Sequence, residues 1–154
     1  MSFAPPSLIL PAEADTAALA GRIALVVRPG DCLLLDGPIG AGKSFFARAL
    51  IRAWLHNPGE EVPSPSFTLV QTYARGDQTL WHCDLYRLTS VQEVVELGLD
   101  EAFATAISLI EWPDRLGDTA PPGALHLRFA ALDDHHRLDM WGPDTWGHRL
   151  GWAD

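Results

Sequence analysis

Residues 37–44 combine glycine, lysine and serine in an order that suits the binding of a phosphate chain. Gly37, Gly42, Lys43 and Ser44 satisfy the Walker A pattern G-x-x-x-x-G-K-S/T, and Lys43 is the only lysine among 11 basic residues. The glycines let backbone N–H groups turn inward around phosphate oxygens, the lysine reaches the β- and γ-phosphates, and the hydroxyl ligates Mg²⁺. The residues that we expect to bind the nucleotide are Gly37, Pro38, Ile39, Gly40, Ala41, Gly42, Lys43 and Ser44. The pattern predicts a nucleotide phosphate site.

The flanking segments predict the strand and helix that such a loop requires. Residues 32–35 form a continuous apolar run, which is typical of a buried parallel strand. Residues 44–56 predict a helix, on which Arg48, Arg52 and His56 form a polar stripe at i, i+4 spacing. We therefore expect the loop to open directly onto a helix whose positive end faces the phosphates.

The rest of the chain predicts a mixed sheet with flanking helices. Residues 67–73 and 79–84 are joined by a short turn and should pair as antiparallel strands. Further strands are expected over residues 7–10, 106–111, 124–129 and 137–141. Further helices are expected from Asp15 or Thr16 to about Val27, from Ser90 to Gly98 with Ser90 and Glu93 as a capping box, and over residues 101–105 with Asp100 as the cap. The fold class is α/β, with a P-loop NTPase-type core and antiparallel strands after its first helix.

Acidic side chains end two of the predicted strands. A phosphate loop needs a carboxylate on a neighbouring strand, to hold Mg²⁺ or to orient the attacking water. Asp84 and Glu111 are the candidates, and the more apolar run before Glu111 predicts the more central strand. The loop after the first helix offers the hydroxyls of Ser64, Ser66 and Thr68 as sensors of the γ-phosphate. These residue types leave open which acid ligates the metal and which orients water.

Two residues border these acids without an evident role of their own. His82 stands two residues before Asp84 and so shares its face of the strand, but no third metal ligand has a helpful spacing. Trp112 follows Glu111 and either shapes the site or packs in the core, and of the two we expect the core.

The composition predicts one domain over residues 1–154, with residues 1–6 and 143–154 as peripheral tails. The formal net charge of −9 argues against strong direct binding of nucleic acid. No apolar run is long enough for a membrane span, and the first residues lack the features of a signal peptide, so we expect a cytoplasmic protein. Cys32 and Cys83 are expected to be buried free thiols.

Four motifs in order resemble the TsaE (YjeE) family, small bacterial ATPases needed to make threonylcarbamoyladenosine in tRNA. The motifs are residues 37–44, 64–67, 82–87 and 111–113, and the resemblance covers roughly residues 8–142. It implies an ATPase that works with two partner proteins of the bacterial threonylcarbamoyl transferase complex, one of which modifies adenosine 37 of tRNA. It also implies ATP or ADP and Mg²⁺ as ligands.

The resemblance assigns roles to five residues. It implies that Lys43 contacts the phosphates, that Ser44 and Glu111 ligate Mg²⁺, and that Asp84 is the Walker B-like acid that completes the metal site. Ser66 is then the loop hydroxyl near the γ-phosphate, at a position where the family pattern has threonine. Adenine contacts are expected from the N-terminal strand and loop.

Two other functions use the same residues. A small-molecule kinase needs an acceptor pocket and a lid with several arginines, whereas the arginines of this chain are scattered. A nucleotide-gated interaction module would bind ATP with little turnover, and the sequence does not separate it from an ATPase.

Overall fold

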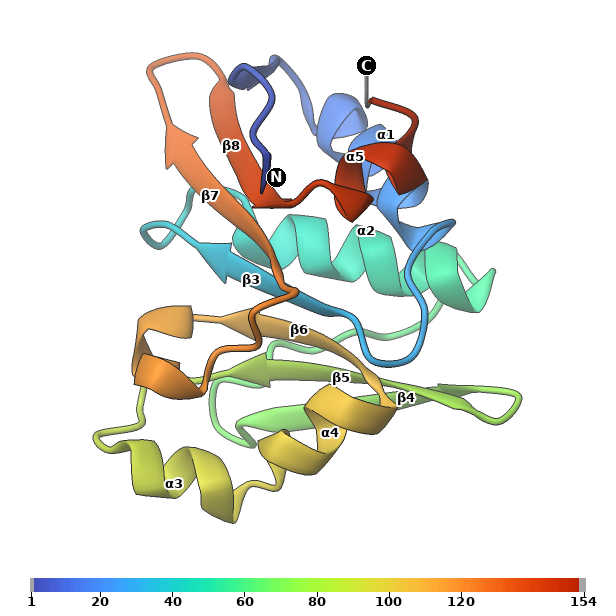
Figure 1. The fold of residues 1–154 in the computed structure, drawn as a ribbon. Coiled ribbons are helices and arrows are strands. Elements are labelled where there is room, and N and C mark those ends of the chain that lie inside the picture. Colours follow the sequence, from blue (N-terminus) through green and yellow to red (C-terminus); the bar gives the residue numbers. More distant parts are fainter. Residues whose placement is uncertain (1, 153–154) are drawn as a thin grey trace.

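A mixed sheet of eight strands runs through the computed structural model, which describes residues 2–152 (Figure 1). The strands are β1 (Ser2–Phe3), β2 (Leu8–Leu10), β3 (Cys32–Asp36), β4 (Val70–Arg75), β5 (Gln78–Asp84), β6 (Ile107–Glu111), β7 (Leu125–Ala131) and β8 (His136–Pro143). The helices are α1 (Glu13–Ala24), α2 (Lys43–Leu55), α3 (Val91–Glu96), α4 (Leu99–Thr105), the 3₁₀ helix η1 (Pro113–Thr119) and α5 (Thr145–Leu150). Within residues 2–152, no helix has the length and apolarity needed to cross a membrane.

The strand order is β1-β8-β7-β3-β6-β5-β4, and β2 also pairs with β8. Strand β3 lies parallel to both β6 and β7, and β6 lies parallel to β5. The hairpin partner β4 is antiparallel to β5 at the edge of the sheet, which confirms the predicted antiparallel strands after the first long helix of the core. Because β3, β5 and β6 are parallel, their carboxyl ends meet at one edge, where Asp84 is the register partner of Glu111. The predicted α/β fold class is confirmed.

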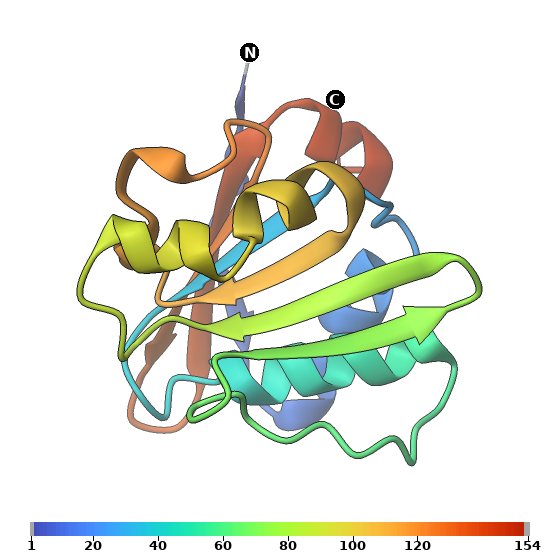
Figure 2. The ribbon, with the colours of Figure 1, turned by 90° about the horizontal axis from the view of Figure 1, so that it is seen from below.

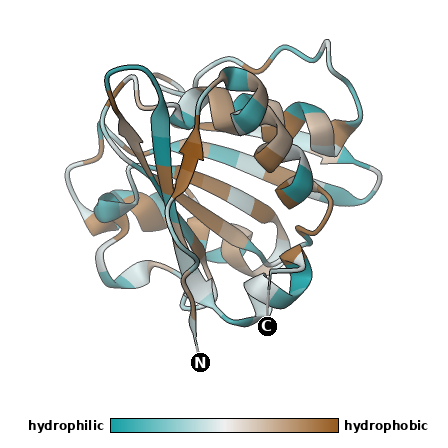
Figure 3. Ribbon diagram, turned by 90° about the horizontal axis from the view of Figure 1, so that it is seen from above, coloured by the Kyte–Doolittle hydropathy of each residue, from teal (hydrophilic) through white to brown (hydrophobic). Residues whose placement is uncertain are grey.

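Helices cover both faces of the sheet (Figure 2). Successive side chains of a strand point to opposite faces, so the apolar strand β3 supplies both halves of the core. Leu33 and Leu35 pack in the cluster that includes α1 and α2, whereas Cys32 and Leu34 pack in the cluster that includes α3, α4 and η1. Figure 3 shows the resulting brown, hydrophobic colour of the central strands.

The two cysteines confirm the expectation of free buried thiols. Cys32 and Cys83 form no disulfide, and both are buried in the second of these clusters. Burial raises the pKa of both thiols well above the ordinary range.

Helix α1 begins earlier than its sequence suggested. The predicted cap was Asp15 or Thr16, but the helix starts at Glu13 and ends at Ala24. The Asp15 carboxylate accepts a hydrogen bond from the backbone N–H of Ala12 at 2.9 Å. Asp15 is therefore the third residue of the helix. At this position its carboxylate accepts a hydrogen bond from the backbone N–H of the residue that caps the helix.

The strand predicted from residue 67 begins at Val70 instead. Leu69 has φ 68°, the left-handed conformation, and its N–H donates to the carbonyl of Pro65 at 2.7 Å. The chain therefore turns before it enters the sheet, and Phe67 stays outside the strand with 85% of its surface exposed.

Ser90 is the N-cap of α3 as predicted, but the capping contacts at two helix starts differ from the prediction. The Glu93 carboxylate accepts hydrogen bonds from the N–H and the hydroxyl of Thr89, at 2.9 and 2.8 Å, and Ser90 makes no side-chain cap. At α4 the capping residue is Gly98, with φ 81°, and Asp100 lies inside the first turn. Both segments are helical as predicted.

The expectation that residues 1–6 and 143–154 are peripheral tails is wrong for much of both segments. Strand β1 pairs with β8, and Phe3 belongs to the core. Helix α5 buries Trp146 completely, and Leu150 is buried beside it. Residues 1, 153 and 154 lie outside the described part of the chain. A helix of six residues is too short to show a helical period in sequence.

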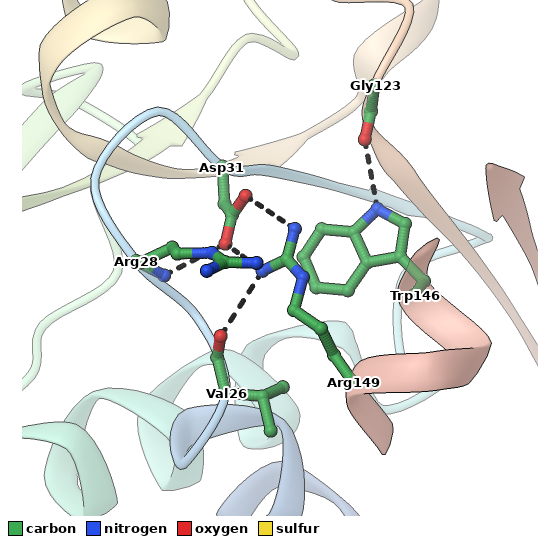
Figure 4. Close-up of polar contacts among 6 residues, drawn as sticks. All are labelled: Val26, Arg28, Asp31, Gly123, Trp146 and Arg149. Carbon is green, nitrogen blue, oxygen red and sulfur yellow. Dashed lines mark hydrogen bonds and ion pairs between the residues drawn. The ribbon is translucent and has the colours of Figure 1, made fainter. Parts of the chain in front are cut away.

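An ion pair fastens α5 to the start of β3 (Figure 4). The Arg149 guanidinium donates to both carboxylate oxygens of Asp31, at 2.5 and 2.9 Å, and also to the carbonyl of Val26 at 3.2 Å. The same guanidinium lies 4.1 Å from the centroid of the Trp146 ring, whose indole N–H donates to the carbonyl of Gly123 at 2.9 Å. Side chains far apart in the sequence thus anchor α5.

Candidate nucleotide site

A cavity of about 640 Å³ lies where the carboxyl ends of β5 and β6 face the start of α2. The predicted site residues that line it are Ile39, Gly40, Gly42, Lys43, Ser44, Ser66, Asp84 and Glu111. Gly37, Pro38 and Ala41 do not line this cavity, and Ala41 is fully buried. The structure therefore brings together the lysine, both acids and the loop hydroxyl that the sequence singled out.

Gly37 and Gly42 of the loop have steric reasons for being glycine. Gly37 has φ 134°, and a Cβ there would lie 2.4 Å from the carbonyl oxygen of Phe129 on β7. Gly42 has φ 108°, and a Cβ there would lie 3.1 Å from Nδ1 of His136. Gly37 thus lets the loop pass against β7, and Gly42 lets α2 begin in the left-handed conformation beside β8.

The ammonium of Lys43 is buried in this cavity without a hydrogen-bond partner among the described residues. Only 5% of the residue's surface is exposed, and its Nζ lies 3.7 Å from the centroid of the Trp112 ring. Burial lowers the pKa of Lys43, and the carboxylates of Glu111, Asp36 and Asp84 oppose that shift. A buried cation with no partner is the polar group that phosphate oxygens would satisfy.

Trp112 belongs to the site as well as to the core. The sequence left both places open and favoured the core, and Trp112 does pack against the apolar cluster under η1. It also has φ 60°, a left-handed conformation that is uncommon for a large side chain, and its ring lies 4.8 Å from that of Tyr86. This backbone conformation sets the indole over Lys43, and that contact depends on tertiary structure.

His82 is a site residue whose role the sequence did not reveal. Its Nε2 lies 2.7 Å from Oε2 of Glu111, a hydrogen bond in which the ring N–H donates to the carboxylate. The pair is buried, with 2% and 3% of the two residues exposed. The sequence shows that His82 shares a strand face with Asp84, but not the parallel pairing of β5 with β6 that brings His82 to Glu111. The hydrogen bond fixes one oxygen of Glu111 and so orients the other.

Asp84 contacts the loop that carries Ser66. Its Oδ1 accepts the N–H of Tyr86 at 3.0 Å, and its Oδ2 lies 3.4 Å from the Ser66 hydroxyl. The hydroxyls of Ser64 and Ser66 lie 2.7 Å apart. Thr68, the third hydroxyl considered, accepts a hydrogen bond from Gln71 outside the cavity. Ser66 is therefore the loop hydroxyl that lies beside an acid of the site.

The cavity contains oxygen donors of the kind that Mg²⁺ prefers. The Ser44 hydroxyl and the carboxylates of Asp84 and Glu111 all line it. Within residues 2–152, no three histidine, cysteine, aspartate or glutamate side chains form a metal-binding group by themselves. These three groups suit a Mg²⁺ ion that enters together with a nucleotide, whose phosphate oxygens would complete the coordination of the metal.

A second cavity of about 390 Å³ adjoins the first. The two share Glu13, Gly42, Phe45 and His136. The second is enclosed by the turn from β2 into α1 and by residues 132–136 between β7 and β8. It lies at the N-terminal strand and loop, where adenine contacts were expected.

Comparisons with known proteins agree on one family. A family model described as threonylcarbamoyl adenosine biosynthesis protein TsaE matches residues 10–138. A Rickettsia bellii protein named tRNA threonylcarbamoyladenosine biosynthesis protein TsaE is 38% identical over 130 residues, which cover 84% of this chain and 90% of that protein. The protein of the same name from Bacillus subtilis is 33% identical over 124 residues, or 80% and 76% of the two chains. The crystal structure of Bacillus subtilis YdiB superposes with a TM-score of 0.77 at 26% identity, over 98% of this chain and 93% of that one.

Proposed function

The chain belongs to the TsaE family of tRNA threonylcarbamoyladenosine biosynthesis proteins, and we propose that it hydrolyses ATP to support a complex that forms threonylcarbamoyladenosine at position 37 of tRNA. The observation that supports this most strongly is the buried Lys43 ammonium, which has no hydrogen-bond partner among the described residues. It faces a cavity that also holds two carboxylates and a loop hydroxyl. That combination suits phosphoryl transfer, which depends on positioning and on the stabilisation of charge.

In this proposal the phosphate chain lies along residues 37–44. Backbone N–H groups at the start of α2 face the phosphates, and the helix adds its positive end. Lys43 exchanges its contact with Trp112 for the β- and γ-phosphate oxygens. Because the ammonium is buried, its contact with the phosphates would be charge-assisted and largely desolvated.

Ser44 and Glu111 would hold Mg²⁺, with Asp84 next to them. When bound, the metal would neutralise charge on the β- and γ-phosphates. His82 keeps the Glu111 carboxylate in one orientation through the 2.7 Å hydrogen bond. A fixed carboxylate loses less conformational freedom when it takes up its ligand.

Asp84 and Ser66 would position the attacking water. The water oxygen attacks the γ-phosphorus, the bond to the β–γ bridging oxygen breaks, and ADP and inorganic phosphate leave with the water's protons. The Asp84 carboxylate accepts a hydrogen bond from that water, and the Ser66 hydroxyl lies 3.4 Å from the same carboxylate. Ser66 stands on an exposed loop, so its approach can differ between bound states.

The second cavity would receive the adenine and ribose. It adjoins the phosphate loop through Gly42 and His136, and its other walls come from β2, α1 and residues 132–136. The partners are two proteins of the threonylcarbamoyl transferase complex, and these partners bind the tRNA. The assembly would be cytoplasmic. The net charge of −9 agrees with a chain that leaves the polyanion to its partners.

The test is ATP turnover by the purified chain, alone and with the two partner proteins and tRNA. The Lys43→Ala variant serves as the negative control. We expect slow turnover alone, stimulation by the partners and no turnover in the variant. Turnover that requires a small acceptor would identify a kinase instead. Binding of ATP without turnover in every mixture would identify a nucleotide-gated module.

A further inference from the structure

Helices α1 and α2 pack together on one face of the sheet (Figure 2). Two grooves adjoin each other along them. The first, of about 570 Å³, follows the flank of α2 and includes Arg48 and Arg52. The second, of about 450 Å³, lies between the ends of α1 and α2 and includes Arg22 and Arg75. Both are lined by Ala53 and His56, so they form one continuous surface, the arginine groove.

The arginine groove concentrates positive charge in an acidic chain. Neither groove has an aspartate or glutamate among its lining residues, although the chain has 20 acidic residues against 11 basic ones. Within residues 2–152, none of the groove's four arginines lies within 4.0 Å of a carboxylate, whereas four arginines elsewhere form ion pairs. No carboxylate of the described residues therefore neutralises the arginines of the groove.

Three of these guanidinium groups are held in place by uncharged groups. Arg22 Nη2 donates to the carbonyl of Leu150 at 2.9 Å, and its guanidinium lies 4.6 Å from the centroid of the Trp152 ring. Arg52 Nε donates to the carbonyl of Glu60 at 2.9 Å. Arg75 Nη1 donates to the carbonyl of Trp54 at 2.9 Å, and its guanidinium lies 4.5 Å from the centroid of the Trp54 ring. Positioned cations lose little side-chain freedom when an anion binds, which favours recognition.

The shape and spacing of the groove suit a helix. Arg48 and Arg52 stand four residues apart on α2, about 6 Å along the helix axis, and His56 follows as the residue that caps the helix end. Between them Ala49 and Ala53 form a floor of small apolar side chains. A helix laid alongside α2 would place carboxylates at i, i+4 positions opposite this stripe and apolar side chains over the alanines.

We propose that the arginine groove is a docking site for an acidic amphipathic helix of a partner protein. The apolar floor and the regular spacing favour a protein segment over RNA, and the net charge of −9 repels a polyanion beyond the groove itself. Phe45 and Arg48 line both this groove and the nucleotide cavity, so the docked helix would lie beside the nucleotide. Docking at this groove goes beyond ATP hydrolysis and does not depend on it.

The probe is a fluorescein-labelled peptide of about 18 residues, five helical turns, with one stripe of glutamate and one of leucine at i, i+4 positions. Control peptides carry glutamine or lysine in place of glutamate. Fluorescence anisotropy without nucleotide is expected to show saturable binding of the glutamate peptide that weakens with added salt. The glutamine and lysine peptides are expected to bind at least about tenfold more weakly, because they offer no anion to the arginines.

Two variants test the location. Ala53→Glu puts a carboxylate in the shared floor and should weaken peptide binding at least about tenfold, since like charges repel across an interface. Arg52→Gln should weaken it about two- to fivefold, the usual worth of an exposed charge pair. The matched control Arg28→Gln removes an exposed arginine outside both grooves and should leave it unchanged. ADP affinity should stay the same in Ala53→Glu, because Ala53 does not line the nucleotide cavity.

Three results would overturn the proposal. The first is the absence of saturable peptide binding at low salt, or equal binding by the wild type and Ala53→Glu. The second is a tRNA transcript that binds more tightly than the peptide and is released by Ala53→Glu, which would make the groove an RNA site. The third is self-association in sedimentation velocity that Ala53→Glu abolishes, which would make its occupant a second copy of the chain.

Discussion

The hydrogen bond between His82 and Glu111 offers a quantitative test of how the site is built. Both residues are almost fully buried, and the N–H of His82 satisfies a carboxylate oxygen at 2.7 Å. His82→Leu removes the donor and leaves that oxygen in an apolar setting. A lost charge-assisted hydrogen bond costs about 1.5–3 kcal/mol of unfolding free energy, which lowers the Tm of a chain of this size by about 3–12 °C.

The assay is urea unfolding, combined with a double-mutant cycle. His82→Leu, Glu111→Leu and the double variant separate the pair from the effects of either replacement alone. The double variant should be less destabilised than the sum of the two single changes by about 2 kcal/mol, since replacing both partners leaves no orphaned group. His82→Gln, which keeps an N–H donor, should recover part of the loss. Mg²⁺-dependent nucleotide binding by His82→Leu should weaken about tenfold or more, as expected when the group orienting a metal ligand is removed.

The matched control is His148→Leu, which changes an exposed histidine on α5 and should alter stability by less than about 0.5 kcal/mol. A His82→Leu variant as stable as the wild type within that margin would refute the stabilising role of the pair. Single changes whose effects simply add would refute it as well.

Charge and burial lead to three further predictions. Lys43→Ala should weaken ATP binding by about 1.5–3 kcal/mol, roughly 10- to 150-fold, in isothermal titration calorimetry. An affinity within twofold of the wild type would show that Lys43 does not contact the phosphates. Cys32 and Cys83 should resist a thiol reagent in the native protein and react fully in urea, because burial raises the pKa of both thiols; rapid native labelling would contradict their burial. Arg149→Ala should lower the unfolding free energy by about 2 kcal/mol, since it leaves Asp31 without its bidentate partner; an unchanged Tm would show that α5 is not anchored there.

The centre of the site is predictable from local patterns in the sequence. The loop of residues 37–44 is contiguous, and each of its glycine, lysine and hydroxyl positions follows from the chemistry of phosphate binding. Asp84 and Glu111 are recognisable as strand ends, and the parallel pairing of β5 with β6 makes them register partners. Ser66 is one of three hydroxyls on its loop, and only the fold shows that it is the one beside Asp84.

The residues that the sequence left without a role act through tertiary contacts. His82 orients Glu111, which lies on the neighbouring strand β6. Trp112 covers Lys43 because its backbone is left-handed and because α2 brings Lys43 to the ring. Trp146 lies in a helix too short to show a period, and its burial depends on contacts with segments far away in the sequence. Such contacts link positions that no spacing rule connects.

The arginine groove illustrates a similar limit. Its stripe of Arg48, Arg52 and His56 is visible as a helical pattern, and an ordinary solvated face is a sufficient explanation for that pattern alone. Arg75 comes from the far strand β4, and Arg22 comes from α1. Only the folded chain shows that these side chains line one surface without a carboxylate among its lining residues.

The central claim is that the buried ammonium of Lys43 receives the phosphates of a nucleotide. Because Lys43 is the only lysine, ¹³C-labelled lysine gives a single side-chain signal in NMR spectra of the whole protein. Without nucleotide, the pKa of Lys43 should lie below its ordinary value of 10.5, and the signal should carry the ring-current shift of Trp112. Addition of ATP and Mg²⁺ should raise this pKa, because phosphate charge favours the ammonium, and should change the ring-current shift. A lysine signal and pKa that stay the same at saturating ATP would contradict the account.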